Sequence, residues 1–247
     1  MKVLGIIPSR YESSRFPGKP LINIDGKSMI QRVYEQTSKS TLINKLIVAT
    51  DDQRIFDHVK SFGGNVMMTL TTHTSGTDRC GEVIEKYSDF DIVINIQGDE
   101  PLINPNQLDD VINLFKTESV QIGTLVKQMT SIDDILNPNR VKVVLDQNNK
   151  GIYFSRSPIP YVANTNQKDW LTKAKFWKHI GIYAWRMNAL KTIVKLPKTE
   201  LEQQESLEQL RWLYNGFKIT TVETKIETPN IDVPEDLEKV LSLLKMK

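Results

Sequence analysis

The chain has 247 residues, of which 39% are hydrophobic and 25% charged, and its 32 Lys and Arg against 30 Asp and Glu give a formal net charge of +2. This composition is typical of a globular protein with a sizeable core, and the near-neutral charge argues against a nucleic-acid-binding protein with a strongly basic face. Cys80 is the only cysteine, and the sequence has neither a signal-peptide pattern nor an apolar run long enough to span a membrane, so we expect a reduced, cytoplasmic protein.

The first half of the chain alternates short β-branched runs with helical patterns, which indicates βαβ units around a mainly parallel sheet. In one predicted helix, for example, Met29, Ile30, Val33 and Tyr34 fall on a single apolar stripe. Strands are predicted at 3–8, 45–50, 65–70 and 91–97, and helices at 28–39, 52–62 and 77–87.

The alternation is interrupted in the second half of the chain. The predicted elements there are helices at 107–115, 205–213 and 234–244, strands at 120–128, 179–186 and 218–223, and a hairpin of 141–146 with 152–155. Residues 157–176 are polar, contain proline, and are predicted to form a mobile loop. Because no repeat or clear linker is present, we expect one domain, 1–247, with an insertion at about 120–190.

Three cations follow the first predicted strand in the stretch IIPSRYESSRFPGKPL, namely Arg10, Arg15 and Lys19. They lie where the carboxyl end of a parallel strand opens on the ligand crevice of an α/β sheet, and Arg and Lys are suited to phosphate oxygens. The stretch matches neither GxxxxGK[ST] nor GxGxxG. Taken alone, it predicts a phosphate site or a solvated basic turn equally well.

Two separated carboxylates complete this pattern. Asp99 follows the predicted strand 91–97 after Gly98, which permits a sharp turn, and Asp232 lies in NIDVPEDL near the end of the chain. A carboxylate at the mouth of a strand is a common Mg²⁺ ligand beside a nucleotide. Each motif alone is also explained by turn or helix-capping chemistry. In combination with the cationic loop, the pair predicts a metal–triphosphate site.

Two further groups of residues are candidates for ligand contacts. In SGTDR, Ser75 and Thr77 begin a predicted helix and can present hydroxyl and N–H groups to a phosphate or sugar, although they also form an ordinary N-cap. In the second half, the candidates are Arg156, His179, Tyr183, Glu208 and Gln209. Composition does not decide whether His179 is functional or structural.

Nine sequence blocks occur in an order that is specific to one family. They are IIPSRYESSRFPGKPL, VATDD, SGTDR, NIQGDEP, NPNRVKVVLD, YFSR, HIGIY, LEQLR and DVPEDLEKV. From end to end, the chain therefore closely resembles the 3-deoxy-manno-octulosonate cytidylyltransferases, also called CMP-Kdo synthetases. The blocks QGDEP and RxxxxRxPGKPL carry the most specific part of this resemblance.

The resemblance implies a fold, a reaction and partners. The fold is α/β, with a mainly parallel nucleotidyltransferase sheet of the glycosyltransferase-A-like, Rossmann-related type, flanked by helices, and with an antiparallel excursion used for homodimerisation. The reaction joins CTP to the C2 hydroxyl of the acid sugar Kdo, giving CMP-Kdo and pyrophosphate. It requires Mg²⁺ and supplies lipopolysaccharide biosynthesis in the cytoplasm, with neither nucleic acid nor membrane as a partner.

The resemblance also implies a role for each matching residue. The implied nucleotide-binding positions are Pro8, Ser9, Arg10, Arg15, Lys19, Thr50, Ser75, Thr77, Arg79, Gln97 and Asp99. The implied sugar-binding positions are Gln97, Arg156, His179, Tyr183, Glu208 and Gln209. Asp99 and Asp232 are the implied metal ligands, and Arg15, Lys19 and Asp99 the implied catalytic residues.

The expected mechanism is an in-line attack of the sugar oxygen on the α-phosphorus of CTP. It requires no protein nucleophile, and catalysis would rest on positioning and on neutralising developing charge. Asp99 and Asp232 are expected to hold Mg²⁺, while Lys19 and Arg15 would stabilise the departing pyrophosphate.

Several alternatives stay open. Val233 replaces the Thr of the more usual Asp-Thr-Pro, and Ser-Ser-Arg-Phe also occurs in relatives that act on 8-amino-3,8-dideoxy-manno-octulosonate, so this sugar or a capsule pathway is the nearest alternative. A sugar-1-phosphate nucleotidyltransferase is disfavoured because its Gly-rich opening is missing. A noncatalytic nucleotide-sensing protein is disfavoured by the two retained carboxylates.

Overall fold

The computed structural model describes residues 1–12 and 16–245. The prediction for Arg15 lies outside the described residues. Among the helices that the model describes, none is both long and apolar enough to cross a membrane.

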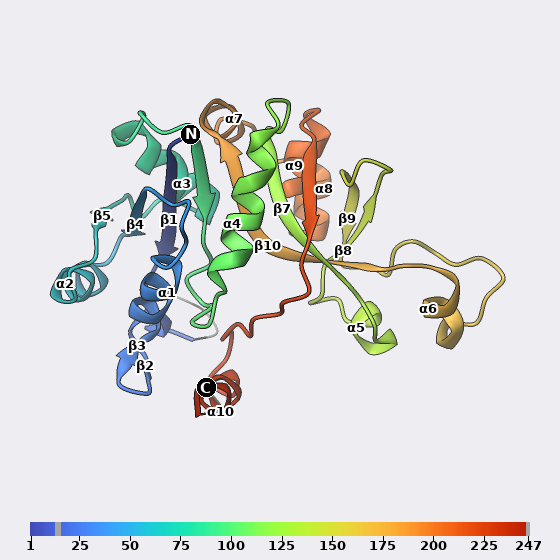
Figure 1. The fold of residues 1–247 in the computed structure, drawn as a ribbon, viewed down its shortest axis with the longest axis horizontal. Coiled ribbons are helices and arrows are strands. Elements are labelled where there is room, and N and C mark those ends of the chain that lie inside the picture. Colours follow the sequence, from blue (N-terminus) through green and yellow to red (C-terminus); the bar gives the residue numbers. More distant parts are fainter. Residues whose placement is uncertain (13–15, 246–247) are drawn as a thin grey trace.

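A mixed sheet forms the centre of the molecule (Figure 1). Along its main path the strand order is β11-β7-β10-β6-β1-β4-β5, and every described strand on this path except β10 runs in the same direction. These strands are β1 (Val3–Ser9), β4 (Lys45–Thr50), β5 (Val66–Met68), β6 (Ile92–Asn95), β7 (Ile122–Gln128), β10 (Trp177–Arg186) and β11 (Ile219–Glu223). The predicted mainly parallel sheet is therefore confirmed.

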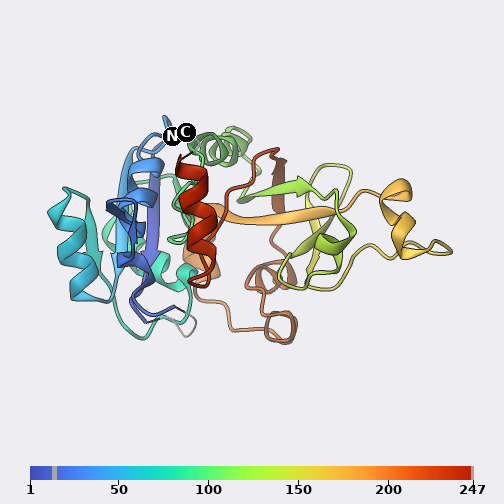
Figure 2. The same ribbon diagram turned by 90° about the horizontal axis from the view of Figure 1, so that it is seen from below.

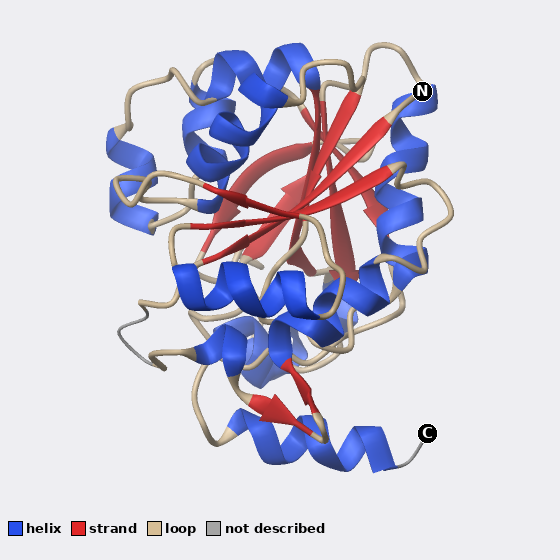
Figure 3. Cartoon of the chain, turned by 90° about the vertical axis from the view of Figure 1, so that its left-hand side faces the viewer, coloured by secondary structure: helices blue, strands red, loops and turns tan. Residues whose placement is uncertain are grey.

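Helices cover both faces of the sheet (Figure 3). Side chains alternate along β1, so that Val3 and Ile7 pack with one set of helices while Leu4 and Ile6 pack with the other. The first set comprises α1 (Met29–Thr37), α2 (Gln53–Ser61), α4 (Pro105–Asn113) and α10 (Asp236–Lys245). The second set comprises α3 (Gly76–Lys86), α7 (Met187–Ile193) and α9 (Gln209–Tyr214).

Polar N-caps fix where several of these helices begin. The side chains of Ser28, Asp52, Ser75 and Asn104 accept hydrogen bonds from backbone N–H groups in the first turns of α1, α2, α3 and α4. At the opposite end of the chain, Val240 of α10 is completely buried. Helix α10 lies beside a small separate hairpin of β2 (Asn23–Ile24) and β3 (Lys27–Ser28), as Figures 1 and 3 both show.

An arm, residues 129–176, projects from the sheet between β7 and β10, and Figures 1 and 2 show it extending away from the rest of the molecule. It contains α5 (Ile132–Leu136), β8 (Lys142–Leu145), β9 (Gly151–Ser155) and α6 (Trp170–Lys173). Strand β8 pairs antiparallel with both β9 and the start of β10. The expected antiparallel excursion is confirmed.

The second half differs from the predictions in several details, among them the helices α5 and α7, which were not predicted. The predicted loop 157–176 contains α6 and a small core, because Trp170 stacks on Phe176 with ring centroids 5.8 Å apart and both are buried. The single helix predicted at 205–213 is wrong. Helix α8 (Glu200–Glu205) ends at Ser206, whose φ of 51° is left-handed, and α9 starts only at Gln209.

Candidate active site

A cavity of about 310 Å³ opens at the carboxyl ends of β1 and β6. This edge of the sheet is the usual ligand-binding edge of α/β folds. Most of the predicted site residues line the cavity, namely Pro8, Ser9, Arg10, Lys19, Ser75, Arg79, Gln97, Asp99, Glu208 and Asp232. The residues predicted for phosphate and metal contacts, apart from Arg15, Thr50 and Thr77, are thus brought together by the fold.

Lys19 connects the two predicted metal ligands. Its Nζ donates a hydrogen bond to Asp99 Oδ2 at 2.9 Å and lies 3.7 Å from Asp232 Oδ1. The same ammonium donates to the carbonyl of Ile231 at 2.9 Å, and only 15% of the Lys19 side chain is exposed. Two carboxylates from distant parts of the chain therefore share one partly buried cation.

Close backbone packing holds Asp99 in this position. A Cβ added to Gly98 would lie 3.0 Å from the carbonyl oxygen of Pro8, so the turn after β6 passes directly against the end of β1. The backbone N–H of Ile231 donates to the carbonyl of Asp99 at 2.9 Å. Gly98 is not among the residues with a positive φ, so it is close approach, and not the predicted sharp turn, that requires glycine here.

A local turn orients Asp232. The carboxylate of Asp236, in the first turn of α10, accepts hydrogen bonds from the backbone N–H groups of Asp232 at 2.8 Å and Val233 at 3.1 Å. Asn230 donates to Asp232 Oδ2 at 2.8 Å. The Asp236 carboxylate therefore binds the backbone at the start of α10, while Asp232 Oδ1 lies 3.7 Å from Lys19 Nζ.

The two carboxylates fit a divalent cation that is shared with a phosphate. Within the described part of the chain, no cluster of three or more His, Cys, Asp or Glu side chains could hold a metal ion. Mg²⁺ is commonly bound by one or two carboxylates, with phosphate oxygens and water completing its coordination. Asp99 and Asp232 match that partial set of ligands, and their role as metal ligands stays a prediction.

The SGTDR segment contributes to the wall of the cavity. Ser75 Oγ accepts a hydrogen bond from the backbone N–H of Asp78, as an N-cap. Arg79 is 3% exposed, and its guanidinium donates to Asp51 Oδ2 at 2.7 Å and to the hydroxyl of Thr69. Arg79 therefore lines the cavity with a guanidinium that is already engaged within the protein.

Thr50 and Thr77 are buried and do not line the cavity. Thr50 Oγ1 accepts a hydrogen bond from the backbone N–H of Asp52 at 3.2 Å. Burial raises the pKa of Glu208, and hydrogen bonds from Thr77 and Ser75 partly offset this rise. The two threonines thus support neighbouring groups in the protein, and direct contact with a nucleotide stays a prediction.

Three predicted sugar contacts have a buried polar atom with no hydrogen-bond partner among the described residues. These atoms are Tyr183 Oη, Gln209 Nε2 and Glu208 Oε2, of which the last lies 4.0 Å from Arg211 Nη2. Tyr183 packs edge-on against Trp212 of α9, the helix that Glu208 and Gln209 begin, with ring centroids 4.8 Å apart. Of these three residues, Glu208 lines both cavities, whereas Tyr183 and Gln209 line neither, so their contact with a sugar stays a prediction.

A second cavity, of about 250 Å³, extends from this region along α8 and α9. It shares Thr74, Ser75 and Glu208 with the first cavity. Gln97, which lines the first cavity, is anchored by a hydrogen bond from its Nε2 to the carbonyl of Gly181 in β10, at 2.8 Å. Together, the two cavities form a polar region large enough for more than one ligand group.

His179 and Arg156 lie outside the cavity lining. The ring of His179 packs against Phe154 and Tyr183, and its Nε2 is 3.0 Å from Thr124 Oγ1. Burial, with a smaller effect of Lys178, lowers the pKa of His179 to about 3, so the imidazole is neutral at physiological pH. A contact between His179 and a sugar stays a prediction.

Arg156 bonds to the backbone in the described structure. Its Nε donates to the carbonyl of Glu205 at 2.7 Å, and its Nη1 donates to that of Pro138 at 3.1 Å. The guanidinium thus connects the end of β9 to the end of α8. Its predicted sugar contact is likewise untested.

His73 was missed by the sequence analysis, although it lines the cavity. Its Nε2 is hydrogen-bonded to the carboxylate of Glu82 on α3, and the carboxylate of Glu82 also accepts the backbone N–H of Leu70. The only signal in the sequence is that His73 stands two residues before the SGTDR block.

Comparisons with known proteins agree with this geometry. A family model for cytidylyltransferases matches residues 4–222. The chain is 52% identical over 249 residues to the 3-deoxy-manno-octulosonate cytidylyltransferase of Parabacteroides distasonis, with 99% of this chain and 98% of that protein covered. It is 51% identical to the corresponding Bacteroides thetaiotaomicron protein, with 99% of both chains covered.

A solved structure gives the same result for the fold. The chain is similar to a CMP:2-keto-3-deoxy-manno-octonic acid synthetase complexed with CTP, with a TM-score of 0.93 and 43% sequence identity. The match covers 100% of this chain and 99% of the other. The nucleotidyltransferase fold expected from the sequence is therefore confirmed.

Gly98→Ala tests the packing that positions Asp99. We expect the free energy of unfolding to fall by about 1–3 kcal/mol, because the added methyl group meets the Pro8 carbonyl oxygen. The measurement is urea unfolding followed by circular dichroism. Gly181→Ala is the matched control, since its Cβ would meet only Gln97 Nε2 at an ordinary 3.7 Å. Equal stability losses in the two variants would contradict the proposed role of close approach.

The low pKa of His179 predicts a particular acid sensitivity. Between pH 6.5 and about pH 3 the unfolded chain binds a proton on His179 that the folded protein does not, so stability should decrease as the pH falls. This one proton contributes at most about 1.4 kcal/mol per pH unit. Urea unfolding of the parent and of His179→Gln at pH 7, 6, 5 and 4 should show the parent losing more stability. Parallel losses would mean that the folded imidazole is protonated.

Proposed function

The chain belongs to the family of 3-deoxy-manno-octulosonate cytidylyltransferases, and on this premise we propose that it joins CTP and Kdo to give CMP-Kdo and pyrophosphate. It is then a nucleotidyltransferase. The observation that carries the proposal is the meeting of Asp99 and Asp232 at Lys19, beside Arg10, in the cavity at the carboxyl edge of the sheet.

We assign the triphosphate of CTP to the part of the cavity between Arg10, Lys19 and the start of α3. Arg10 is exposed and lines the cavity, so its guanidinium is accessible to phosphate oxygens. The N-terminus of α3, with Ser75 as its N-cap, adds backbone dipoles that favour an anion. Arg15 is assigned to the same role from the sequence alone.

We assign Mg²⁺ to Asp99 and Asp232. When bound, the ion would neutralise charge on the phosphate oxygens. The donor set supports this assignment, because two carboxylates beside a phosphate site are what Mg²⁺ commonly uses. Lys19, which is within reach of both carboxylates, supplies further positive charge at this point.

We assign the sugar to the region around Tyr183, Glu208 and Gln209. Each has one buried polar atom that lacks a hydrogen bond among the described residues and that a polyhydroxylated ligand could satisfy. Gln97 joins this region to the nucleotide cavity and is fixed by its bond to Gly181. The neutral imidazole of His179 would support Tyr183, against which it packs, and could accept or donate one hydrogen bond to the sugar.

The reaction then proceeds by in-line attack of the C2 oxygen of the sugar on the α-phosphorus, as pyrophosphate leaves. The protein side chains hold both substrates and stabilise charge, and the ammonium of Lys19 stabilises the negative charge that develops on the leaving pyrophosphate. No covalent protein intermediate is needed. Cys80, the only cysteine, is completely buried, and burial raises the pKa of its thiol, which makes it a poor nucleophile.

We further propose that the enzyme is a cytoplasmic homodimer that supplies lipopolysaccharide biosynthesis. The arm supports dimerisation, because it exposes apolar side chains that a partner could cover, including Ile152, which is 58% exposed, and Tyr161, which is 79% exposed. The same reaction on 8-amino-3,8-dideoxy-manno-octulosonate, or in a capsule pathway, is the alternative.

A pyrophosphate-release assay tests the proposed function. Each of the four ribonucleoside triphosphates is combined with Kdo, with the 8-amino analogue and with other acid sugars, in the presence of Mg²⁺. We expect release with CTP and Kdo above all other pairs. Faster release with the 8-amino sugar would select the alternative, and the absence of release with CTP and every sugar would reject both.

Asp99→Asn tests the metal assignment. We expect kcat to fall by about 100-fold or more, because the neutral amide is a much weaker ligand for Mg²⁺, while the melting temperature stays close to that of the parent. Steady-state rates at saturating Mg²⁺ provide the measurement. Asp89→Asn is the matched control, since Asp89 pairs with Lys2 at an exposed site. A near-normal rate for Asp99→Asn would remove Asp99 from the metal site.

Lys19→Ala separates stabilisation of the transition state from binding of the substrate. If Lys19 acts on charge that develops as pyrophosphate leaves, kcat should fall by about 100- to 1,000-fold while the Kd for CTP rises less than about ten-fold. Single-turnover rates and calorimetric titration with CTP measure the two effects, with Lys27→Ala of the exposed Lys27–Glu35 pair as control. Equal losses in rate and affinity would assign Lys19 to ground-state binding.

A further inference from the structure

The strap, residues 224–231, connects the end of β11 to Asp232. In Figure 1 it is the red segment that descends from β11 toward α10. It has no helix or strand of its own, so its position depends on side-chain contacts and on single backbone bonds. Because Asp232 follows directly, whatever fixes the strap also helps to place the Asp232 carboxylate.

The first part of the strap is bonded to the sheet and to α4. The backbone N–H of Thr224 donates to the carbonyl of Val126 at 2.8 Å, which extends the pairing of β11 with β7 by one residue. Gln107, which is completely buried in α4, donates from its Nε2 to Thr224 Oγ1 at 3.3 Å and to the carbonyl of Ile226 at 3.2 Å.

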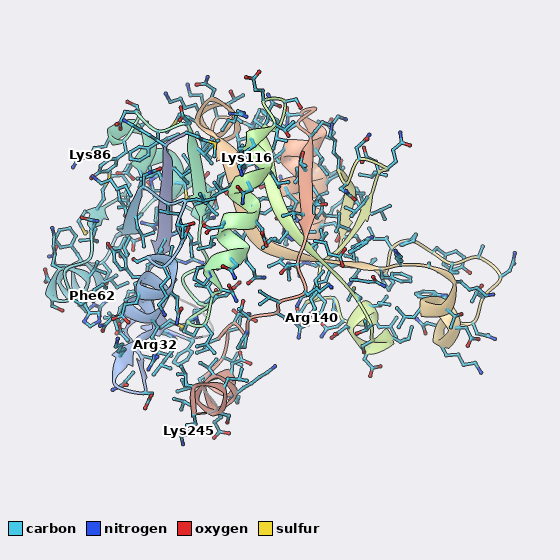
Figure 4. All side chains as sticks on the ribbon, viewed as in Figure 1. Arg32, Phe62, Lys86, Lys116, Arg140 and Lys245 are labelled. Carbon is cyan, nitrogen blue, oxygen red and sulfur yellow. The ribbon has the colours of Figure 1, made fainter. Side chains whose placement is uncertain are left out.

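Glu227, in the middle of the strap, is in contact with three cations. Its carboxylate accepts from Lys127 Nζ at 2.7 Å, from Lys178 Nζ, and from Arg140 Nη1 at 3.4 Å. These cations come from β7, from β10 and from the turn before β8, which all lie at the base of the arm. Figure 4 labels Arg140 there, beside the descending strap. Glu227 thus ties the strap to three separate segments at once.

The charges in this cluster depend on one another. Burial acts to raise the pKa of Glu227, but hydrogen bonds from Lys127 and Lys178 lower it to about 2. Burial also lowers the pKa of Lys178, whose side chain is 15% exposed, and the bond to Glu227 opposes this effect. A single exposed ion pair contributes little to stability, but here removal of the Glu227 carboxylate would take one shared partner from three cations, of which Arg140 would keep Asp134 at 3.7 Å.

Beyond Glu227, the strap is bonded to the loop that carries Asp99. Thr228 Oγ1 donates to the buried carboxyl group of Glu100 at 2.8 Å. The backbone N–H of Ile231 donates to the Asp99 carbonyl at 2.9 Å, and the Ile231 carbonyl accepts from Lys19 at 2.9 Å. The contacts of the strap therefore lead from the base of the arm to both carboxylates of the site.

We propose that Glu227 is a positioning residue, which anchors the strap and thereby holds Asp232 opposite Asp99. This proposal rests on the proposed function, because it gives Asp232 its role as a metal ligand. Among the described residues of the strap, Glu227 is the one whose side chain forms ion pairs with several segments, whereas the other anchors named above are hydrogen bonds to hydroxyl or backbone groups of the strap. Its loss should therefore loosen the chain next to Asp232 without unfolding the sheet.

Glu227→Gln tests the proposal, with Glu35→Gln as the matched control. Glu35 also accepts hydrogen bonds from a lysine, Lys27, and from Gln31, but it lies on α1 and makes no contact with the strap. Two measurements that need no sugar and no turnover are used. They are hydrogen exchange of the peptide that contains residues 224–232, and Mn²⁺ binding in the presence of CTP, followed by electron paramagnetic resonance. The Mg²⁺ dependence of pyrophosphate release is the third measurement.

In Glu227→Gln we expect faster exchange in 224–232, a Kd for Mn²⁺ about ten-fold higher, and a matching rise in the Mg²⁺ concentration for half-maximal rate. Glu35→Gln should resemble the parent in all three. Lys127→Gln, which removes only one of the three cations, should give a smaller change in the same direction. Circular dichroism shows whether each variant is folded. If Glu227→Gln does not fold, the exchange and Mn²⁺ results for Lys127→Gln decide the test.

Unchanged exchange, or faster exchange with unchanged Mn²⁺ binding, would overturn the proposal. A parent protein that binds Mn²⁺ with CTP but releases no pyrophosphate with any sugar would instead count against the proposed function. The exchange and Mn²⁺ results would still decide the role of Glu227 in that case. A parent that binds no Mn²⁺ would overturn both the metal assignment and the positioning role.

Discussion

The site depends on placing two like charges together, which is unfavourable without a cation between them. Lys19 meets this requirement in the protein itself, since its ammonium contacts Asp99, Asp232 and the carbonyl of Ile231. The position of Lys19 just after β1 is as important as its charge, because β1 lies in the middle of the sheet and next to β6, which leads to Asp99. Through these contacts, Lys19 joins the loop after β1 to the turn after β6 and to the segment before α10.

The direction of β10 explains how the second half of the chain reaches this site. Between β6 and β7, this strand runs against its neighbours, so its middle passes the end of β6 at Asn95, where Tyr183 pairs with it. The same strand continues outward to pair with β8 in the arm. A single strand therefore carries Tyr183 past Asn95, which lines the first cavity, and also fixes the base of the arm.

The sequence was most informative where local patterns decide the structure. The β-branched runs predicted the strands of the first half within a few residues, and the strand-end carboxylates with the cationic loop, together with the family resemblance, predicted Asp99, Asp232 and Lys19 as one site. Tertiary contacts decide the rest. Nothing in the sequence reveals that Arg79 is bonded to Asp51, that Gly98 must pass Pro8, that Ser206 breaks the late helix, or that a strap bonded through Glu227 leads to Asp232.

At the proposed sugar site, the buried polar atoms of Tyr183, Glu208 and Gln209 would let the enzyme select its acceptor by rejecting poor matches as much as by attracting good ones. A sugar that bears matching hydroxyl groups satisfies them, whereas a deoxygenated analogue enters the same space and leaves a donor or acceptor stranded away from water. Each such mismatch costs about 1–3 kcal/mol, which is roughly a five- to 150-fold disadvantage. Fidelity toward close chemical mimics would then arise from groups that were already in place before any acceptor arrived.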